Sequence, residues 1–294
     1  MIRTACALLA ICGVVLTTAC AATAPVDHTA RVAMASSAPA GLPRPDHVLI
    51  VVLENRRRHE VAREAPYLAS LADVGAELMN MHAGTRPSQP NYLALFSGDV
   101  HGVTDDSCPH TFDAPNLGTE LAAAGLSFAG YSEDLPEPGF AGCRAGGYAR
   151  ERSPWASFST VPSTAHQPMS AMPAGHRALP TVSFLVPNLC HGMRDCSVAE
   201  GDSWLRENID GYAQWARTHN SLLVVTFDES RPSRRGDNHI ATLLVGEMVR
   251  PGAYYERADH YRLLRTIEDM YGLPPLGHSA TTTALRSMWQ SPAP

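Results

Sequence analysis

The stretch His47-Val-Leu-Ile-Val-Val-Leu53, followed directly by Glu54-Asn55, decides the fold class of this 294-residue chain. A continuous apolar run of this kind, without polar alternation, is typical of a strand buried on both faces of a parallel sheet. The run then ends abruptly in a carboxylate and an amide. Because open α/β sheets bind ligands beyond the carboxyl ends of their strands, these two side chains are the first candidates for a functional site.

Further apolar runs and helix signals alternate along the rest of the chain. Strands are predicted at residues 126–131, 181–186, 222–227 and 240–245. The predicted helices run from Pro66 to Gly75, from Pro90 to Gly98, from Asn116 to Gly125, from Asp202 through Trp215, and from Asp259 to Gly272. Proline opens helices, Asn and Asp cap them and Gly closes them. This alternation predicts an α/β/α sandwich with a mainly parallel central sheet.

One long segment does not fit the alternation. Residues 132–180 carry little periodicity and many Pro and Gly residues. A segment of that length inside a compact domain is usually functional or forms a small subdomain.

The N-terminal segment predicts export. Arg3 precedes an apolar stretch at residues 5–16 and small residues up to Ala24, which matches a cleaved signal peptide over residues 1–24 and is too short to span a membrane. Alternatively, Thr-Thr-Ala-Cys20 resembles a lipoprotein cleavage box, with a lipid-anchored Cys20, although Leu16 lies one position further from Cys20 than that box usually places it. Residues 25–45 read as a flexible tether, which leaves residues 46–294 as one domain.

The cysteines outside this segment are even in number. Cys108, Cys143, Cys190 and Cys196 are expected to form two disulfides in an exported chain, free buried thiols being the alternative. Cys190 and Cys196 share one short loop and are expected to pair with each other. That pairing leaves Cys108 to pair with Cys143.

Composition excludes one broad class of function. The chain has 45% hydrophobic residues, enough for a sizeable core, and a formal net charge of −6. A nucleic-acid-binding protein needs a basic face, so no nucleic-acid partner is expected.

Two strand ends deliver oxygen ligands to the same edge of the predicted sheet. Glu54 and Asn55 follow the first strand, and Asp228 and Glu229 follow the strand at 222–227. Four such oxygens suit a divalent cation such as Mg, Mn, Ca or Fe(II), whereas zinc is less favoured without a His cluster. An acidic residue after a strand is otherwise usually a solvated loop residue.

A serine lies at the start of the second predicted helix, in Thr85-Arg-Pro-Ser88-Gln-Pro-Asn91. With Pro90 at the first helical position, Ser88 lies just ahead of the helix N-terminus, where free N–H groups and the positive dipole end favour a phosphate. Ser88 is therefore a candidate nucleophile, and Asn91 a candidate donor to a phosphoryl oxygen. The plain alternative is that Ser88 only caps the helix.

The loop Pro187-Asn-Leu-Cys190-His191-Gly-Met-Arg-Asp195-Cys196 offers two further polar side chains. His191 is a candidate general acid for the leaving oxygen, and Asp195 a candidate substrate contact. His260 opens the last helix and is a candidate ligand, acid or substrate contact, or only a neighbour of the cap.

These segments resemble a known family. The chain resembles the bacterial phosphoesterase family of secreted acid phosphatases and phospholipase C enzymes, in the alkaline-phosphatase-like superfamily, and is most similar to single-domain secreted acid phosphatases, some of which act on phosphoinositides. The matching motifs are Val-Val-Leu-Glu54-Asn55, Pro-Ser88-Gln-Pro-Asn91-Tyr-Leu-Ala-Leu-Phe-Ser-Gly, Gly-Tyr-Ser-Glu133-Asp134-Leu-Pro, Tyr148-Ala-Arg150, Val-Pro-Asn-Leu-Cys-His191, Leu-Leu-Val-Val-Thr-Phe-Asp228-Glu229, and His260-Tyr-x-Leu-Leu-Arg-Thr-Ile-Glu-Asp-Met-Tyr-Gly.

The resemblance implies that Ser88 takes the phosphoryl group beside a metal held by the two strand-end pairs, with His191 near the phosphate. Three departures stand out. Arg86 replaces a frequent His and is a candidate phosphate clamp, because an arginine donates two parallel hydrogen bonds but no proton. Residues 56–58 are three arginines, and the segment after Glu229 is basic rather than acidic.

Together these features predict a secreted, or lipid-anchored, metal-dependent phosphatase that hydrolyses phosphate monoesters, phosphoinositides among them, through a phosphoserine. The alternatives are a phospholipase C-type phosphodiesterase and, more remotely, a non-catalytic phosphate- or lipid-binding lipoprotein. The expected partner is a small-molecule or lipid phosphate ester, with membrane contact only through the anchor or a lipid substrate. A sulfatase is disfavoured, because the sequence holds no Cys-x-Pro-x-Arg motif.

Overall fold

The computed structural model describes residues 41–232 and 236–290. The predicted signal peptide, Cys20 and most of the predicted tether lie outside the described residues, so those predictions remain untested. Among the described residues, no helix is both long and apolar enough to cross a membrane.

The central sheet of the described chain has eight strands in the order β10-β2-β9-β8-β1-β7-β3-β6. Their bounds are β1 His47–Leu53, β2 Ala76–Leu78, β3 Phe128–Ser132, β6 His166–Pro168, β7 Val182–Val186, β8 Ser221–Phe227, β9 Thr242–Val245 and β10 Gly252–Tyr254. The strand β1 lies between β7 and β8 and runs parallel to both. Residues 48–53 are at most 1% exposed, so the opening apolar run is the buried centre of the sheet.

The strand β9 is the exception to the parallel arrangement. It pairs antiparallel with β8 on one side and with β2 on the other. The apolar run at 240–245 predicted a buried strand correctly, but hydrophobicity carries no information on strand direction.

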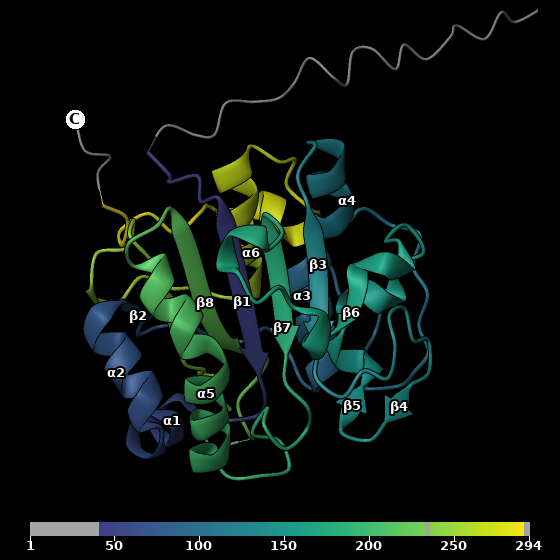
Figure 1. Ribbon diagram of the computed structural model, residues 1–294, viewed down its shortest axis with the longest axis horizontal. Helices are drawn as coiled ribbons and strands as arrows, with labels where there is room; N and C mark the ends of the chain where they lie inside the picture. Colours follow the sequence, from purple (N-terminus) through teal and green to yellow (C-terminus); the bar gives the residue numbers. More distant parts are fainter. Residues whose placement is uncertain (1–40, 233–235, 291–294) are drawn as a thin grey trace, which may run out of the picture. The chain divides into compact units, whose positions relative to one another are not determined.

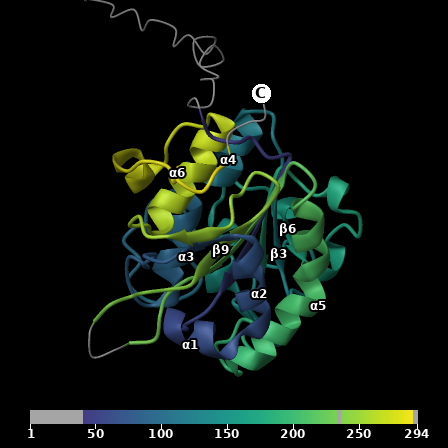
Figure 2. The same ribbon diagram turned by 90° about the vertical axis from the view of Figure 1, so that its left-hand side faces the viewer.

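Helices cover both faces of the sheet (Figures 1 and 2). One face carries α1 Arg58–Glu64, α2 Pro66–Val74 and α5 Val198–Ala216, and the other carries α3 Ser88–Ser97, α4 Leu117–Ala123 and α6 His260–Tyr271. The predicted α/β/α sandwich with a mainly parallel sheet is confirmed.

Two predicted helix starts are wrong. Helix α3 begins at Ser88 rather than Pro90, with Pro87 at the N-cap position. Pro90 lies in the first turn of the helix, where a proline is tolerated because first-turn N–H groups have no partner within the helix. Helix α5 begins at Val198 after the capping Ser197, so Asp202 lies inside it. The buried Asp202 carboxylate instead accepts from the N–H groups of Tyr67 (2.8 Å) and Leu68 (3.0 Å) and caps α2 from the neighbouring helix.

The irregular segment 132–180 is an ordered extension of the sheet. Its elements are the hairpin β4 Arg144–Ala145 and β5 Tyr148–Ala149, the 3₁₀ turns Arg150–Arg152, Pro154–Ser157, Ser163–Ala165, Met169–Ala171 and His176–Ala178, and β6; a further 3₁₀ turn, Gly277–Thr281, follows α6. Strand β6 pairs in parallel with β3 at the sheet edge.

Both predicted disulfides are present. Cys108 joins Cys143 with a Cα–Cα distance of 5.9 Å. Cys190 joins Cys196 with a Cα–Cα distance of 4.6 Å. The first ties the irregular segment to the loop that follows α3, and the second closes the short loop after β7.

Candidate active site

The two strand-end pairs meet because β1 and β8 are adjacent and parallel. Asn55 follows β1 in a left-handed backbone conformation (φ 45°), which Asn adopts more readily than most residues. Its backbone N–H donates to Asp228 Oδ1 at 3.1 Å, and the same oxygen accepts from the N–H of Glu229 at 2.6 Å. The Asp228 carboxylate thus fixes both pairs in place.

The side chain of Ser88 lies against this arrangement from α3. Its hydroxyl is fully buried and lies 3.3 Å from Asn55 Oδ1 and 3.3 Å from Glu229 Oε1. The same end of the Asn55 amide also lies 3.2 Å from Asp228 Oδ1 and 3.2 Å from Glu229 Oε1. With the amide nitrogen on this side, its two hydrogens donate to two of the three surrounding oxygens, and the amide oxygen accepts from Arg194 Nη1 at 2.9 Å. With the amide oxygen on this side, it would add a fourth ligand around a cation.

The carboxyl groups here are held in an environment that disfavours their charge. Burial, with the neighbouring Asp228, raises the pKa of Glu229 to about 8. Burial raises the pKa of Asp228 to about 6 and that of Glu54 to about 8. Buried carboxylates without enough compensating charge are a suitable environment for a divalent cation, so the residues fit a metal of the predicted hard type.

Glu54 has partners that the sequence did not reveal. The guanidinium of Arg152, itself 2% exposed, forms an ion pair with Glu54 Oε2 and a 2.6 Å contact with Glu151 Oε1. Arg194 lies 3.9 Å from the same Glu54 oxygen. Among the contacts described, Glu54 therefore pairs with Arg152 rather than joining the Ser88 cluster, by which we mean Ser88, Asn55, Asp228 and Glu229. Arg152 opposes the rise in the pKa of Glu54 that burial causes but does not cancel it.

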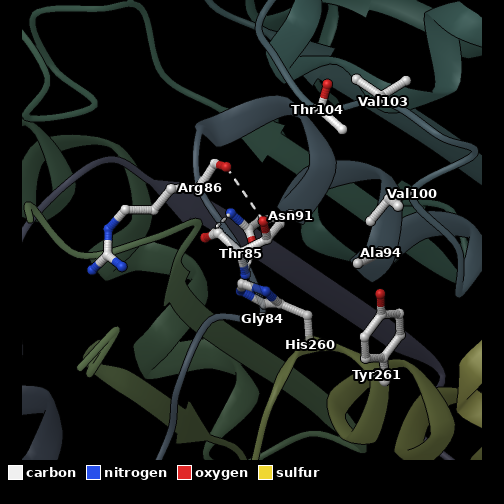
Figure 3. Close-up of a pocket in the computed structure, with 10 residues that line it drawn as sticks. All are labelled: Gly84, Thr85, Arg86, Asn91, Ala94, Val100, Val103, Thr104, His260 and Tyr261. Carbon is white, nitrogen blue, oxygen red and sulfur yellow. Dashed lines mark hydrogen bonds between the residues drawn. The ribbon is translucent and has the colours of Figure 1, made fainter. Parts of the chain in front are cut away.

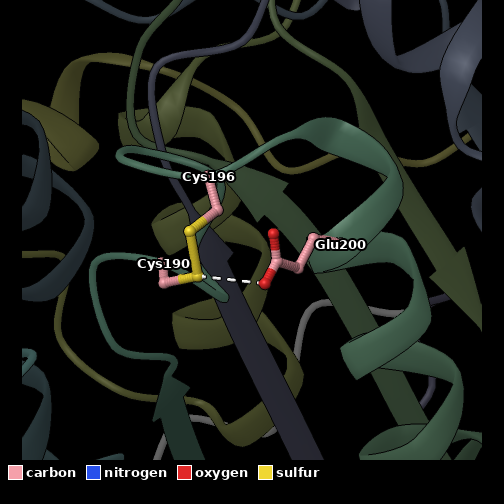
Figure 4. Close-up of side chains that lie close together, drawn as sticks. All are labelled: Cys190, Cys196 and Glu200. Atoms are coloured by element: carbon pink, nitrogen blue, oxygen red, sulfur yellow. Dashed lines mark hydrogen bonds between the residues drawn. A yellow bond between two sulfur atoms is a disulfide. The ribbon is translucent and has the colours of Figure 1, made fainter.

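A separate group of side chains has metal-like spacing but the wrong chemistry. Among the described residues, Cys190, Cys196 and Glu200 bring three potential ligand atoms within 4.8 Å of one another. Figure 4 shows that the two sulfurs are joined to each other. Metals bind thiolates, and a disulfide has none, so this group is not a metal site.

Arg86 and Asn91 are engaged with the protein itself. Arg86 donates to Ser230 O (3.1 Å), Ser230 Oγ (2.9 Å) and Asp237 O (3.0 Å), and lies 3.6 Å from Glu229 Oε2. The Asn91 amide nitrogen donates to Thr85 O (2.9 Å) and Pro87 O (3.0 Å). Both hydrogens of that nitrogen are used, so Asn91 holds the turn before Ser88, and the expected donation to phosphate is not supported.

The start of α3 is also already occupied. The N–H of Gln89, in the first turn, donates to Asp106 Oδ1 at 2.8 Å. The expected set of free N–H groups for phosphate is therefore reduced, and the acidic partner was not recognised in the sequence.

A cavity of about 340 Å³ is lined by Thr85, Arg86 and Asn91, which flank Ser88 in the sequence, although Ser88 itself is not part of the lining (Figure 3). Ala94, Val100, Val103 and Tyr261 form its apolar wall, and Gly84, Thr85, Arg86, Asn91, Thr104 and His260 complete the lining. The guanidinium of Arg86 points away from the apolar wall.

His260 contributes a buried ring to this lining. Its Nε2 donates to the carbonyl oxygen of Phe227 at 2.9 Å, since a carbonyl can only accept. Burial lowers the pKa of His260, which favours the neutral ring, and Nδ1 is buried without a hydrogen-bond partner. Asp259 caps α6 as predicted, accepting from the N–H of Arg262 at 2.9 Å.

His191 is oriented by a carboxylate. Its Nδ1 lies 2.8 Å from Glu133 Oε1, its ring stacks on Trp204, and Trp204 Nε1 donates to the same carboxylate oxygen at 3.0 Å. The loop touches the site through Gly192, whose carbonyl accepts from the N–H of Glu54 at 2.8 Å. Asp195 is exposed, and no described contact links its side chain to the Ser88 cluster.

The class of the fold follows from similar solved structures. The chain resembles a protein of the alkaline phosphatase superfamily from Vibrio parahaemolyticus, with a TM-score of 0.56, 13% identity and 83% and 72% of the two chains covered. It also resembles murine ectonucleotide pyrophosphatase/phosphodiesterase 5, with a TM-score of 0.55, 11% identity and 83% and 100% covered. The fold is thus that of the alkaline phosphatase superfamily, as predicted.

Sequence comparison gives the family. The profile of the Phosphoesterase family matches residues 61–274, and the chain belongs to this family of hydrolases acting on phosphate esters. It is 46% identical over 269 residues to the phosphatidylinositol-3-phosphatase of Mycobacterium tuberculosis, covering 90% of this chain and 88% of that protein. It is 27% identical over 228 residues to the phosphate-repressible acid phosphatase of Penicillium chrysogenum, covering 71% of this chain and 55% of that protein.

Proposed function

We propose that this protein is a metal-dependent phosphomonoesterase that uses Ser88 as its nucleophile. The observation that carries the proposal is the convergence of the buried Ser88 hydroxyl with the Asn55 amide and Glu229 Oε1, each at 3.3 Å, beside Asp228. Asn55, Asp228 and Glu229 would hold the cation, with Glu54 next to them. A bound divalent cation would favour the alkoxide form of Ser88 and offset charge on the phosphoryl oxygens.

The proposed reaction has two displacements. Ser88 Oγ attacks phosphorus and its proton passes to solvent. The bond from phosphorus to the ester oxygen breaks, and that oxygen takes up a proton and leaves as an alcohol. His191, whose ring Glu133 orients, is the proposed donor of that proton. Water then attacks the phosphoserine, which restores the Ser88 hydroxyl and releases phosphate. Glu229 accepts from Ser88 and orients Oγ, and Asn91 fixes the preceding turn.

The cavity lined by the residues that flank Ser88 is the proposed site for the alcohol part of the substrate. Its wall of Ala94, Val103 and Tyr261 favours a leaving group with an apolar face, while Thr85 and Thr104 supply hydroxyls. The similarity to a phosphatidylinositol-3-phosphatase supports phosphoinositides as candidate substrates. We also propose that the protein acts outside the cytoplasm, as its disulfides and predicted signal peptide support.

The test compares ester classes and metals in one series. The protein is stripped with a chelator, dialysed, and assayed on p-nitrophenyl phosphate and on the corresponding diester after addition of Mg, Mn, Ca or Fe(II) singly. We expect chelation to abolish activity, one metal to restore it, and the monoester to be preferred by about 100-fold, a difference of about 2.7 kcal/mol in activation free energy. Full activity in the chelated protein, or preference for the diester, would overturn the proposal.

A further inference from the structure

The helix that carries Ser88 has no cap of its own. The N-cap residue of α3 is Pro87, which forms no side-chain capping hydrogen bond. The N–H of Gln89 instead donates to Asp106 Oδ1, 2.8 Å away and 17 positions later in the sequence. A loop that returns after α3 therefore supplies the acceptor that the first turn needs.

The side chain of Gln89 makes a second connection to the same loop. It is 2% exposed, and its amide nitrogen, turned toward the carbonyl oxygens that face it, donates to Ser107 O (2.8 Å) and Asp105 O (3.2 Å). The residue next to Ser88 thus contacts the 103–108 loop through both its backbone and its side chain.

This 103–108 loop is itself anchored and adjoins the substrate cavity. Cys108 is joined to Cys143, which fixes the end of the loop to the irregular segment. At its start, Val103 and Thr104 line the cavity together with Asn91 of α3. The loop therefore connects the disulfide, the cavity wall and the first turn of α3.

We propose that Asp106 is a positioning residue that holds Ser88 in its reactive orientation through the hydrogen bond to the Gln89 N–H. The inference rests on the proposed function, in which Ser88 is the nucleophile. Because Gln89 follows Ser88 directly, freedom at its N–H becomes freedom at the Ser88 backbone. A displacement of about 1 Å at a reacting group can cost on the order of 100-fold in rate. The essential property of Asp106 is its acceptor oxygen, which asparagine also provides.

The test uses three variants of the full-length, metal-loaded protein, assayed for kcat and KM on p-nitrophenyl phosphate, for bound metal and for thermal unfolding. We expect Asp106→Ala to lower kcat by about 10- to 100-fold with KM within about threefold and bound metal unchanged. Asp106→Asn keeps the acceptor and should restore kcat to within about threefold of the parent. The control, Asp113→Asn, removes an exposed charge beyond the 103–108 loop and should stay within about twofold.

Two results would overturn the inference. One is an Asp106→Ala variant whose kcat lies within about twofold of the parent. The other is an Asp106→Asn variant as slow as Asp106→Ala, because the charge and not the hydrogen bond would then matter. Should Asp106→Ala fail to fold, Asp106→Glu keeps the charge but moves the acceptor oxygen by one methylene, and it should lower kcat by about tenfold; unchanged kcat there also overturns the inference.

A separate experiment distinguishes failure of this inference from failure of the proposed function. Acid quench of the parent during turnover should place phosphate on Ser88. Phosphorylated Ser88 in the parent, together with an unimpaired Asp106→Ala, refutes only the positioning role. No phosphate on Ser88 refutes the proposed function, whatever the variants do.

Discussion

At the scale of single residues, the site depends on oxygens that are brought together with their charge only partly compensated. Asp228 accepts from the backbone of both Asn55 and Glu229, and burial raises its pKa to about 6. A carboxylate in this position fixes the two strand ends, and in the proposed function it would also supply charge for a cation. Its structural and ligand roles separate when only the charge is removed.

Asp228→Asn is predicted to lose metal while keeping the fold. The asparagine oxygen still accepts from the backbone N–H groups, but the ligand charge is gone. Metal affinity should therefore fall by more than the roughly 10- to 100-fold that is typical for residues behind the ligands, and activity should fall with it. Titration calorimetry of the metal-stripped protein measures this directly. Glu268→Gln is the matched control, since Glu268 is equally buried and also has a raised pKa. Its carboxylate accepts hydrogen bonds from Ser279 Oγ and the Leu276 N–H, away from the strand ends. Equal metal loss in both variants would contradict Asp228 as a ligand.

At the scale of helices and strands, apolar patterns predicted the elements well and their long-range contacts poorly. The strand β1 has the predicted bounds, because a continuous apolar run cut off by Glu54 is unambiguous. The direction of β9 was not predictable, since burial is the same for either direction. The ion pair between Arg152 and Glu54 joins residues almost a hundred positions apart, and no local pattern marks it.

In the candidate site, too, the positions of the residues were predictable and their individual hydrogen bonds were not. The convergence of Ser88, Asn55, Asp228 and Glu229 was predictable because strand ends and helix starts meet at one sheet edge, while their roles stay a prediction. The use of the Asn91 amide to hold its own turn was not, because the residue type fits donation to phosphate or to backbone equally well.

The capping of α2 by Asp202 gives a prediction for these elements. Asp202→Ala leaves the Tyr67 and Leu68 N–H groups without a partner in a buried setting, and should lower the free energy of unfolding by about 2–4 kcal/mol. Denaturant unfolding measures it. Glu207→Ala, an exposed position on the same helix, should change stability by less than about 0.5 kcal/mol. Similar small effects in both would show that α2 does not depend on this cap.

At the scale of the whole molecule, the irregular segment 132–180 is bound to the catalytic core at several points. Arg152 reaches Glu54, Glu133 reaches His191, and Cys143 reaches Cys108. The segment therefore supports the site and is not a detachable insertion.

The two disulfides should contribute unequally to this architecture. In the chain-entropy model, closing the 35-residue separation of Cys108 and Cys143 is worth about 3.8 kcal/mol, and the 6-residue separation of Cys190 and Cys196 about 2.2 kcal/mol. Paired Cys→Ser variants compared by urea unfolding measure both. Equal losses of unfolding free energy in the two variants, or a larger loss when the Cys190–Cys196 bond is removed, would contradict this ranking.

Stability of the metal-free protein should depend on pH through the buried carboxyl groups. Burial raises the pKa of Glu229 to about 8 from 4.5, so its contribution is complete below about pH 4.5 and is lost as pH rises through 8. Between pH 5 and pH 8, the melting temperature of the chelated parent should therefore fall relative to that of chelated Glu229→Gln. Metal should reduce this shift, because a cation favours the ionised group. A difference that moves in the parent's favour with rising pH would contradict the assignment.

The central claim is that Ser88 carries the phosphoryl group, and acid-quench mass spectrometry during turnover of a phosphomonoester tests it most directly. The account predicts phosphate on the peptide that contains Ser88, and loss of turnover by several orders of magnitude in Ser88→Ala, because orientation alone supplies roughly 7–11 kcal/mol. Ser97→Ala, another buried serine of α3, should keep near-parental turnover. An unmodified Ser88 peptide together with a Ser88→Ala variant within about tenfold of the parent would contradict the account.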